Sequence, residues 1–563
     1  MSKESVNFLE LFKDKKYSLI ISIIEGKISD KERSPGLLNL LGICKLMEGN
    51  NSKESLISAL ENFRASYLKE KDKKNAIHQL KNFINAATIL FDKEFYKNET
   101  EIDSKLFDEI FLYFNENKEL FENNSEIVNS IIKVYRRNND VINVIKYLQK
   151  LIKISPNTDA LSSLIYFNNY LYDWDQLKHL ENSKTLNDML PLYSTSDLIE
   201  IDKSKNKINK INIGFISSDI KAQHSVTYFL RSVLTIYDSN KFNIYIYHNH
   251  NTKDETTSEF ERLVNKVSYI NKLNDIETIN LIRKDEIDII IDLNGFSSNH
   301  RLSLFKNRLA PIQVSWCGYT NTTGINEMDY LLVDENLILQ NEKELYSEKI
   351  IYLPNIWNCH SGYNKQRFKK ELPVKKNNYI TFGSFNNFRK INDDVINVWS
   401  SILKELKNSK LILKTSVAAF KLNLQNKFKK NGVIDSVKFL PFKSSFDDHL
   451  NAYNKIDISL DTFPWNGVTT SFESMWMDVP VITMKGFNFN SRCGESINKN
   501  LKLEDLIAQN KEDYINKAVN LANDVKRLEE IRNYLNEKLL DSPLFNKKEF
   551  SEQFFFCLEK IYR

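Results

Sequence analysis

The residues best placed to bind a ligand lie in residues 457–486, which read as strand, loop, helix and strand. The loop is rich in turn residues and includes Asn466 and Gly467, and Thr469 and Thr470 then open the helical pattern. A helix N-terminus at the end of a strand presents free N–H groups and a positive dipole end, which suit a phosphate. Gly467 would let the backbone approach that ligand closely. The alternative is an ordinary connection in which a threonine caps the helix.

Glu473 lies one helical turn further into the same pattern. An acid near a nucleotide phosphate site commonly holds a ribose hydroxyl. The segment would therefore suit a nucleotide ligand.

A lysine follows a second predicted strand, at residues 379–387. Lys390 comes just past the end of this strand, and Asn386 and Asn387 precede it. A lysine in this position can neutralise the charge that grows on a departing diphosphate. The alternative is a surface lysine in a lysine-rich chain.

Two histidines lie near predicted strand ends. His224 begins the helix that follows the strand at 211–217, where it can act as a base, orient an acceptor hydroxyl or bind substrate. It can equally be satisfied as a helix cap. His449 falls in the first turn of a helix that Ser445 is expected to cap. It would lie against a nucleobase or simply cover the helix face.

No metal site is predicted from the spacing of acidic residues. Asp173-Trp174-Asp175 has the DxD spacing of metal-dependent glycosyltransferases, but it follows a helical region with no preceding strand. Asp447 and Asp448 are adjacent in a helix pattern and so point in different directions. We therefore expect neither a metal nor another cofactor.

Composition limits the class of protein. The net charge of +4 is small against 78 basic and 74 acidic residues, which argues against a nucleic-acid partner. The five cysteines are widely spaced, which fits a reducing compartment. The N-terminus lacks the order of a signal peptide, and the apolar run at residues 17–24 is too short to span a bilayer. These features predict a cytoplasmic protein without a membrane span.

The 563 residues are enough for about three domains. Residues 1–185 read as helices, with helical spacing at 37–50, 55–72, 125–140 and 141–157. Helix pairs about 34 residues apart suggest a short tetratricopeptide-like array. The repeat is degenerate, so an irregular helical domain is the alternative.

From residue 209 the pattern changes to apolar runs that alternate with helical segments. The first series of expected strands is 211–217, 242–248, 286–296, 312–319, 328–334 and 349–354. After the polar stretch 369–378 a second series follows: 379–387, 410–416, 437–442, 457–463 and 481–484. Continuous apolar strands separated by helices predict parallel sheets covered on both faces. We therefore expect two doubly wound domains, 186–370 and 371–563, with a cleft at the carboxyl ends of their strands. The last 20 residues are expected to form an amphipathic helix that packs back onto the body.

Residues 209–550 resemble the O-GlcNAc transferase family, glycosyltransferase family 41. The matching segments include GFISSD with HSVTYFL, APIQVSWCGY, FGSFNNFRKI, LDTFPWNGVTT and DSPLFNKKEF. The resemblance implies an α/β GT-B fold of two Rossmann-like domains, the first on the acceptor side and the second on the nucleotide-sugar side. It also implies an inverting, metal-independent transfer of GlcNAc from UDP-GlcNAc to Ser/Thr hydroxyls of proteins. The tetratricopeptide-like helices and the cleft would bind the protein acceptor.

The resemblance also assigns roles to individual residues. His224 matches the family's acceptor-side histidine, and Lys390 and Asn387 match residues that contact the donor diphosphate. His449 matches the histidine beside the uridine. The remaining donor-binding positions that the resemblance implies are Asn466, Gly467, Thr469, Thr470 and Glu473.

Three departures leave the donor open. Val468 replaces a family histidine, residues 319–322 lack the usual Pro-Gly, and one extra residue separates Asp219 from His224. Relatives on this fold transfer glucose from UDP-glucose to Asn, or use GDP-fucose. The alternatives are therefore a protein N-glucosyltransferase and a catalytically dead helical-repeat adaptor.

Overall fold

The computed structural model describes residues 7–94, 102–172, 175–201, 210–363, 367, 371–415, 418–441 and 445–563. The chain forms two compact units. The smaller one comprises Met1–Ala160 with Thr415–Asn426, and the larger one Leu161–Lys414 with Lys427–Arg563. The predicted domain boundary at residue 185 stays a prediction.

Of the DxD segment, Asp173 and Trp174 lie outside the described residues, and Asp175 caps α11 by accepting a hydrogen bond from Leu177.

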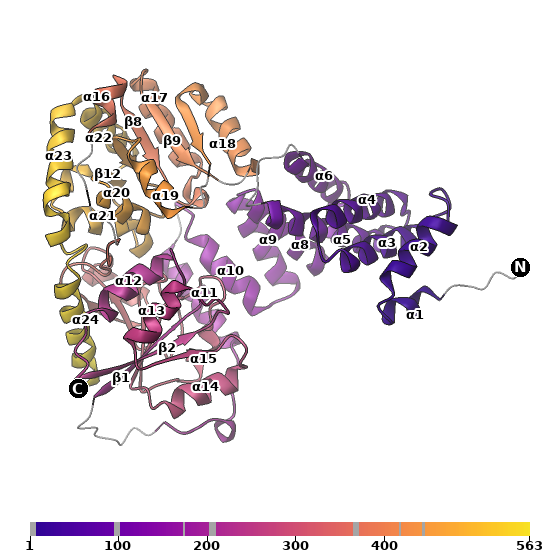
Figure 1. Cartoon of the computed structure of the whole chain (residues 1–563), viewed down its shortest axis with the longest axis horizontal. Coiled ribbons are helices and arrows are strands. Elements are labelled where there is room, and N and C mark those ends of the chain that lie inside the picture. The colour runs from indigo at the N-terminus through magenta and orange to yellow at the C-terminus, as the bar shows by residue number, and fades with distance from the viewer. Residues whose placement is uncertain are drawn as a thin grey trace, which may run out of the picture. The chain divides into compact units, whose positions relative to one another are not determined.

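The smaller unit is helical, as the periodicity predicts. Its helices are α1 (Phe8–Lys13), α2 (Tyr17–Lys27), α3 (Pro35–Glu48), α4 (Lys53–Lys69), α5 (Lys73–Glu94), α6 (Ile102–Glu116), α7 (Lys118–Phe121), α8 (Ser125–Arg137) and α9 (Val141–Ile154). Successive helices pack as neighbours, α3 against α4 and α8 against α9 (Figure 1). Ser34 accepts a hydrogen bond from Leu37 N and Ser52 one from Ser55 N, so both helices of the α3–α4 pair begin at serine caps. Helix α10 (Thr158–Asn168) begins at the end of this unit, and most of it belongs to the larger one.

The first sheet of the larger unit has seven parallel strands in the order β3-β2-β1-β4-β5-β6-β7. They are β1 (Ile211–Ser217), β2 (Phe242–His248), β3 (Lys266–Tyr269), β4 (Ile289–Asp292), β5 (Ile312–Ser315), β6 (Tyr330–Val333) and β7 (Lys349–Tyr352). Its helices are α11 (Gln176–Met189), α12 (Ser225–Leu234), α13 (Glu255–Leu263), α14 (Asp275–Lys284) and α15 (Leu302–Lys306), with short turns η1 (Thr195–Asp197) and η2 (Gln340–Leu345). Strands β1 and β2 have the predicted bounds. Strand β3 was not predicted, because this edge strand is only half-buried and has no continuous apolar run.

The second sheet has six parallel strands in the order β10-β9-β8-β11-β12-β13. They are β8 (Thr381–Ser384), β9 (Lys410–Lys414), β10 (Val437–Leu440), β11 (Ile458–Leu460), β12 (Val481–Met484) and β13 (Ile507–Ala508). Its helices and short turns are α16 (Pro373–Asn377), η3 (Phe388–Lys390), α17 (Asp393–Glu405), η4 (Ile434–Ser436), α19 (Phe446–Tyr453), α20 (Thr469–Trp476), α21 (Phe489–Asn500), η5 (Glu504–Leu506), α22 (Lys511–Asn523), α23 (Val525–Lys538) and η6 (Leu539–Asp541). Helix α18 (Ala418–Lys430) follows β9 in the chain, and most of it belongs to the smaller unit. The two-residue strand β13 was not predicted because it is too short to show a periodicity.

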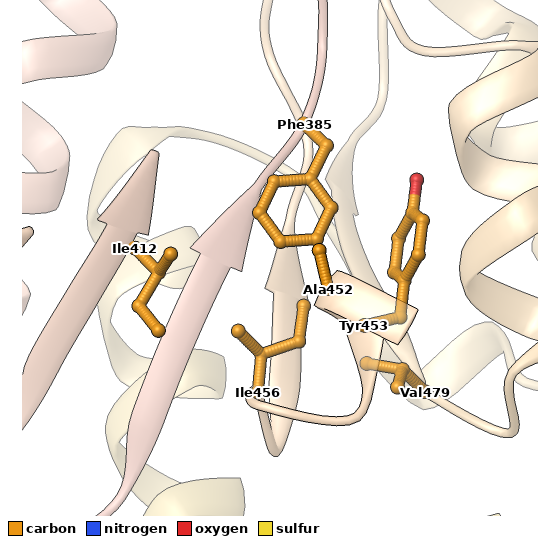
Figure 2. Close-up of a cluster of buried hydrophobic side chains, with 6 residues drawn as sticks. All are labelled: Phe385, Ile412, Ala452, Tyr453, Ile456 and Val479. Atoms are coloured by element: carbon orange, nitrogen blue, oxygen red, sulfur yellow. The ribbon is translucent and has the colours of Figure 1, made fainter. Parts of the chain in front are cut away.

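Part of the second domain's core lies on the sheet face that α19 covers. Figure 2 shows Ile412 of β9 beside Phe385, which follows β8, and Ile456, which precedes β11. Helix α19 adds Ala452 and Tyr453. The hydroxyl of Tyr453 points away from the apolar cluster in Figure 2, so one side chain serves both the core and a polar site.

The predicted C-terminal helix is α24 (Lys547–Tyr562), and it packs on the first of the two sheet domains (Figure 1). The ring of Phe554 lies 4.5 Å from that of Trp316, and Phe555 lies 4.8 Å from Phe242. Ser551 Oγ donates a 2.5 Å hydrogen bond to the carbonyl of Ile236. The chain therefore returns from the second domain to close the first.

Both sheets reverse their strand order at one point, between β1 and β4 and between β8 and β11. This is the doubly wound arrangement, in which ligands bind beyond the carboxyl ends of the strands at the point of reversal. The predicted fold class is confirmed: helices precede two Rossmann-like domains of the GT-B type. Within the described ranges, no helix has the length and apolar content needed to cross a bilayer.

Candidate functional site

A cavity of about 520 Å³ lies where the loops at the two reversal points meet. The loops that follow β1, β4 and β5 line it from the first domain, and those that follow β8 and β11 line it from the second. Five of the predicted site residues line this cavity: His224, Asn387, Lys390, Thr469 and Thr470. The two parallel sheets therefore bring His224 and Lys390, which are 166 positions apart in the sequence, to the same cavity.

Lys390 is held against the loop that follows β11. Lys390 is the last residue of the short turn η3. Asn387 comes just before this turn and caps it, because its side chain accepts a 3.0 Å hydrogen bond from Arg389 N. The Lys390 ammonium group donates a 2.6 Å hydrogen bond to the carbonyl oxygen of Asn466 and lies 5.2 Å from the Trp465 ring centroid. Removal from water lowers the pKa of Lys390 to about 8, and the charge of the nearby Asp461 opposes this shift. Lys390 is thus a poorly hydrated cation at the cavity wall.

The N-terminus of α20 opens onto the same cavity. Val468 occupies the N-cap position, and no side chain of the described chain caps this helix. The alternative, in which a threonine caps α20, is therefore wrong. Thr470 instead donates a 2.7 Å hydrogen bond from Oγ1 to the Asn386 side-chain oxygen. Uncapped N–H groups with a positive dipole end can bind an anion.

Asn466 and Gly467 shape this helix start without lining the cavity. The Asn466 side chain is buried, donates to the Thr462 carbonyl oxygen at 2.9 Å and accepts from Gly494 N at 3.1 Å. A Cβ at Gly467 would lie 2.6 Å from Thr470 Oγ1 and 2.7 Å from Asn386 Oδ1. The position therefore requires glycine, because a methyl group would push into the hydrogen bond between Thr470 and Asn386.

Asp461 holds the loop after β11 in place, although no role was predicted for it from the sequence. Its Oδ1 accepts hydrogen bonds from Gly467 N at 2.7 Å and Thr462 N at 2.9 Å, and its Oδ2 accepts from Thr483 Oγ1 at 2.8 Å. Burial raises the pKa of Asp461 to about 6, while these hydrogen bonds favour the ionised form. The position of Asp461 directly after a strand could have indicated a role. The hydrogen bonds that it accepts are seen only in the folded loop.

His224 faces the cavity from the first domain. It occupies the N-cap position of α12, but its side chain does not cap the helix. Its Nε2 lies 3.5 Å from Asp219 Oδ1, and its Nδ1 is buried without a hydrogen-bond partner in the described residues. Desolvation lowers the pKa of His224, and Asp219 opposes that shift while Lys221 adds to it. The ring is therefore neutral at pH 7, with Nε2 toward Asp219 and Nδ1 turned into the protein.

His449 and Glu473 lie next to this region as a pair and are not among the residues that line the cavity. His449 Nε2 lies 2.9 Å from Glu473 Oε2, and its Nδ1 lies 2.5 Å from the Lys414 ammonium nitrogen. Tyr453 donates from its hydroxyl to Glu473 Oε2 at 3.0 Å and to the carbonyl oxygen of Thr470 at 3.2 Å. The carboxylate is thus held by two partners, one of which also contacts the start of α20. Their predicted contacts with a nucleoside stay predictions.

Four aromatic residues that were not predicted as site residues line the cavity: Tyr166, Tyr170, Phe229 and Trp465. Tyr166 and Tyr170 come from α10 and the segment after it, and Trp465 comes from the loop after β11. The Trp465 ring lies 4.7 Å from that of Tyr170 and 5.4 Å from that of Tyr166. Aromatic residues are frequent in protein cores, so the sequence alone does not indicate that these residues line a site.

The loop at 319–322, which departs from the family pattern, is tied to its surroundings by polar contacts. Gly318 precedes it, where a Cβ would lie 1.7 Å from the Leu293 carbonyl oxygen. The Asn321 side chain accepts a 2.6 Å hydrogen bond from Gln176 of α11, and Thr322 donates to Glu348 at 2.7 Å.

Among the described residues, no group of three or more His, Cys, Asp or Glu is arranged to hold a metal ion.

Comparisons with known proteins agree with this fold. The sequence profile of Glycosyl transferase family 41 matches residues 191–377 and 364–554. A protein of Solanum lycopersicum named as a probable UDP-N-acetylglucosamine–peptide N-acetylglucosaminyltransferase SPINDLY is 32% identical over 425 residues, covering 73% of this chain and 45% of that protein. The Arabidopsis thaliana protein of the same name is 33% identical over 370 residues, covering 64% of this chain and 40% of that protein. A mutant O-GlcNAc transferase of Thermobaculum terrenum has a similar structure, with a TM-score of 0.75 at 24% identity over 94% of this chain and 98% of that one.

The chain belongs to glycosyl transferase family 41, whose profile matches most of its length. It spans less than half the length of the plant relatives it matches. The structural likeness to the Thermobaculum terrenum protein extends over the helices and both sheet domains, and at this level of identity it describes the fold.

Proposed function

We propose that this chain is a glycosyltransferase that moves GlcNAc from UDP-GlcNAc to Ser/Thr hydroxyls of protein acceptors. One observation carries the proposal: the desolvated cation of Lys390 and the uncapped start of α20 line the same cavity as His224. A diphosphate is bound by positive charge and N–H donors. An acceptor hydroxyl needs a proton-accepting or orienting group on the other side of the cavity from the diphosphate. The names of the plant relatives support UDP-GlcNAc as the donor and a peptide as the acceptor.

In the proposed reaction, the acceptor oxygen attacks the anomeric carbon from the face opposite UDP. The new C–O bond forms as the bond between that carbon and the phosphate oxygen breaks, and the electron pair leaves with UDP, which inverts the configuration. Lys390 and the N–H groups of α20 stabilise the charge on the diphosphate, a role that fixed donors in a water-poor site perform well. The hydroxyl proton passes to the neutral His224 ring or, through it, to water. No metal is needed in this scheme, because the lysine and the helix end supply the positive charge.

The acceptor is proposed to reach the cavity from the side of the first domain, with the tetratricopeptide-like helices presenting a further surface to the protein. A cytoplasmic location is proposed with it, because Ser/Thr-bearing proteins and nucleotide sugars meet there.

A donor panel tests the proposal. Purified protein is incubated with an acceptor candidate and, in separate reactions, with UDP-GlcNAc, UDP-glucose or GDP-fucose, and the acceptor mass is measured intact. A HexNAc increment on Ser/Thr with UDP-GlcNAc alone is the expected result. A hexose increment on Asn would replace the proposal with N-glucosyl transfer, and a deoxyhexose increment would replace the donor with GDP-fucose. Nucleotide binding without any transfer across acceptors would favour the catalytically dead adaptor.

A further inference from the structure

A second cavity, of about 550 Å³, lies at the opposite end of the second sheet from the candidate site. Thr381 and Lys410, at the first residues of β8 and β9, and Lys438 of β10 line it. Ligand sites in doubly wound domains lie beyond the carboxyl ends of the strands, whereas this cavity lies at their amino ends. It is therefore separate from the cavity that contains Lys390.

The strand register explains why side chains gather there. Thr381 is in register with Lys410, and Ile412 is in register with Lys438, so these four side chains share one face of the sheet. Ile412 also belongs to the apolar cluster in Figure 2, which α19 covers. Helix α19 ends at Tyr453, and the next residue, Asn454, already lines the cavity. The sheet face beyond the end of this helix is hollow.

The cavity is positively charged. Four of its lining residues are lysines: Lys376, Lys410, Lys438 and Lys455. Two lining residues, Glu371 and Asp435, are acidic. Within the described ranges none of the four lysines forms an ion pair, and Lys410 donates to the main-chain carbonyl of Asp435 at 3.2 Å instead. An excess of two unpaired positive charges around a hollow favours an anionic ligand.

Two buried polar atoms at the cavity have no partner in the described structure. Thr381 is only 2% exposed, and its hydroxyl forms no hydrogen bond. The side-chain oxygen of Asn454 is also unpartnered, while its amide nitrogen donates to Asn451 at 3.3 Å. Both atoms have almost no accessible surface, so they lie just behind the cavity wall. Buried polar groups without partners cost free energy, and a ligand that drew these two groups toward the cavity would give them partners.

We propose that this cavity binds a small organic phosphate, a phosphate monoester of sugar or nucleotide size. The phosphate group lies against Lys410 and Lys438 and accepts a hydrogen bond from the Thr381 hydroxyl. The organic part packs on the apolar wall that includes Pro373 and donates a hydrogen bond to the Asn454 side-chain oxygen. Lysine suits a phosphate as a compact point charge.

Calorimetric titration of the full chain with AMP, glucose 6-phosphate and inorganic phosphate tests this proposal. Thr381→Val keeps the β-branched shape and removes the hydroxyl, and Lys410→Gln removes one charge. Each change is expected to weaken ester binding about tenfold, as the loss of one hydrogen bond to a charged group does. Lys407→Gln, at an exposed lysine outside the cavity, is the matched control and is expected to bind as the unmodified chain does. Thr381→Val is also expected to raise the thermal midpoint of the free protein slightly, because it removes a buried hydroxyl that has no partner.

Lys390→Ala separates this cavity from the candidate donor site. Ester binding that persists in Lys390→Ala and weakens in Thr381→Val supports the proposal. Four results would overturn it: no saturable binding of any probe, binding that ignores both cavity substitutions, binding lost in Lys390→Ala, or inorganic phosphate binding as tightly as the esters. The last result would mean that the apolar wall contributes nothing.

Discussion

The ammonium nitrogen of Lys390 lies 2.6 Å from the main-chain carbonyl oxygen of Asn466 and donates a hydrogen bond to it. This bond joins the loop after β8 to the loop after β11, across the point where the strand order of the second sheet reverses. A carbonyl oxygen orients the lysine without neutralising it. The charge of Asp461 acts on Lys390, but Lys390 forms no ion pair in the described part of the chain, so its ammonium group can bind an anionic ligand. This is the basis of the predictions on turnover and pH.

Replacing Lys390 by alanine is expected to lower turnover about a hundredfold to a thousandfold, the usual loss when one stabilising donor is removed from a transition state. The thermal midpoint is expected to change little, because the lost hydrogen bond is offset by relief from burying a charge. UDP release and thermal unfolding measure the two effects. Lys404→Ala, at an exposed lysine of α17, is the control. Undiminished UDP release by a folded Lys390→Ala protein would refute the role.

Donor affinity is expected to fall as the pH rises through about 8, the lowered pKa of Lys390. The same group has the opposite effect on folding. Between pH 8 and the ordinary lysine value of 10.5 the unfolded chain holds more protons, so this group makes stability rise with pH. Titration of UDP at several pH values measures the affinity. Lys390→Arg, which stays charged throughout this range, should lose the alkaline decline; a decline that survives in this variant belongs to another group.

The acid limb of the rate profile is expected to lie below pH 6.5. Desolvation lowers the pKa of His224, so the ring stays neutral at pH 7 and gains a proton only at lower pH. His224→Asn should reduce kcat/KM and remove that limb. His78→Asn, at an exposed histidine of the smaller unit, is the control. An acid limb of unchanged midpoint in His224→Asn would show that His224 is not the titrating group.

Gly467→Ala is expected to weaken donor binding about tenfold with a stability loss of about 1–3 kcal/mol, the usual cost of inserting a methyl group into a packed site. The added Cβ would meet both partners of the hydrogen bond from Thr470 to Asn386. Denaturant unfolding and UDP titration measure the changes. Gly26→Ala is the control, because a Cβ there meets nothing within 4 Å and alanine favours the helix. Normal UDP affinity in Gly467→Ala would mean that the Thr470 geometry does not matter for the donor.

Tyr453→Phe tests the pair formed by His449 and Glu473. The change removes a donor from a buried carboxylate and is expected to cost about 1–3 kcal/mol of stability. If Glu473 holds the ribose, the KM for the donor should also rise, because the carboxylate is no longer fixed. Tyr534→Phe is the control, since no hydrogen bond of that hydroxyl occurs in the described structure. A stability loss with an unchanged KM would limit Glu473 to a structural role.

The strand pattern predicted most of the fold because buried parallel strands are continuous apolar runs. Strands β1, β2 and β12 have the predicted bounds, whereas β4 is shorter because the apolar run continues into the loop after the strand. Edge strands such as β3 leave no such pattern. The boundary at residue 185 stays a prediction. Gln176 of α11 donates a hydrogen bond to Asn321 in the loop at 319–322, a contact that no local pattern encodes.

The sequence by itself determined the two parallel sheets, the helices ahead of them and the positions of His224, Lys390 and the threonine pair at strand ends. These follow from local periodicity and from residue types that suit a phosphate. Only the tertiary structure decided that Tyr166 and Trp465 share the cavity with Lys390, that Asp461 holds the loop, and that Glu473 is held by His449 and Tyr453. Such contacts join residues far apart in the chain, and they depend on packing and desolvation, which exist only once the chain has folded.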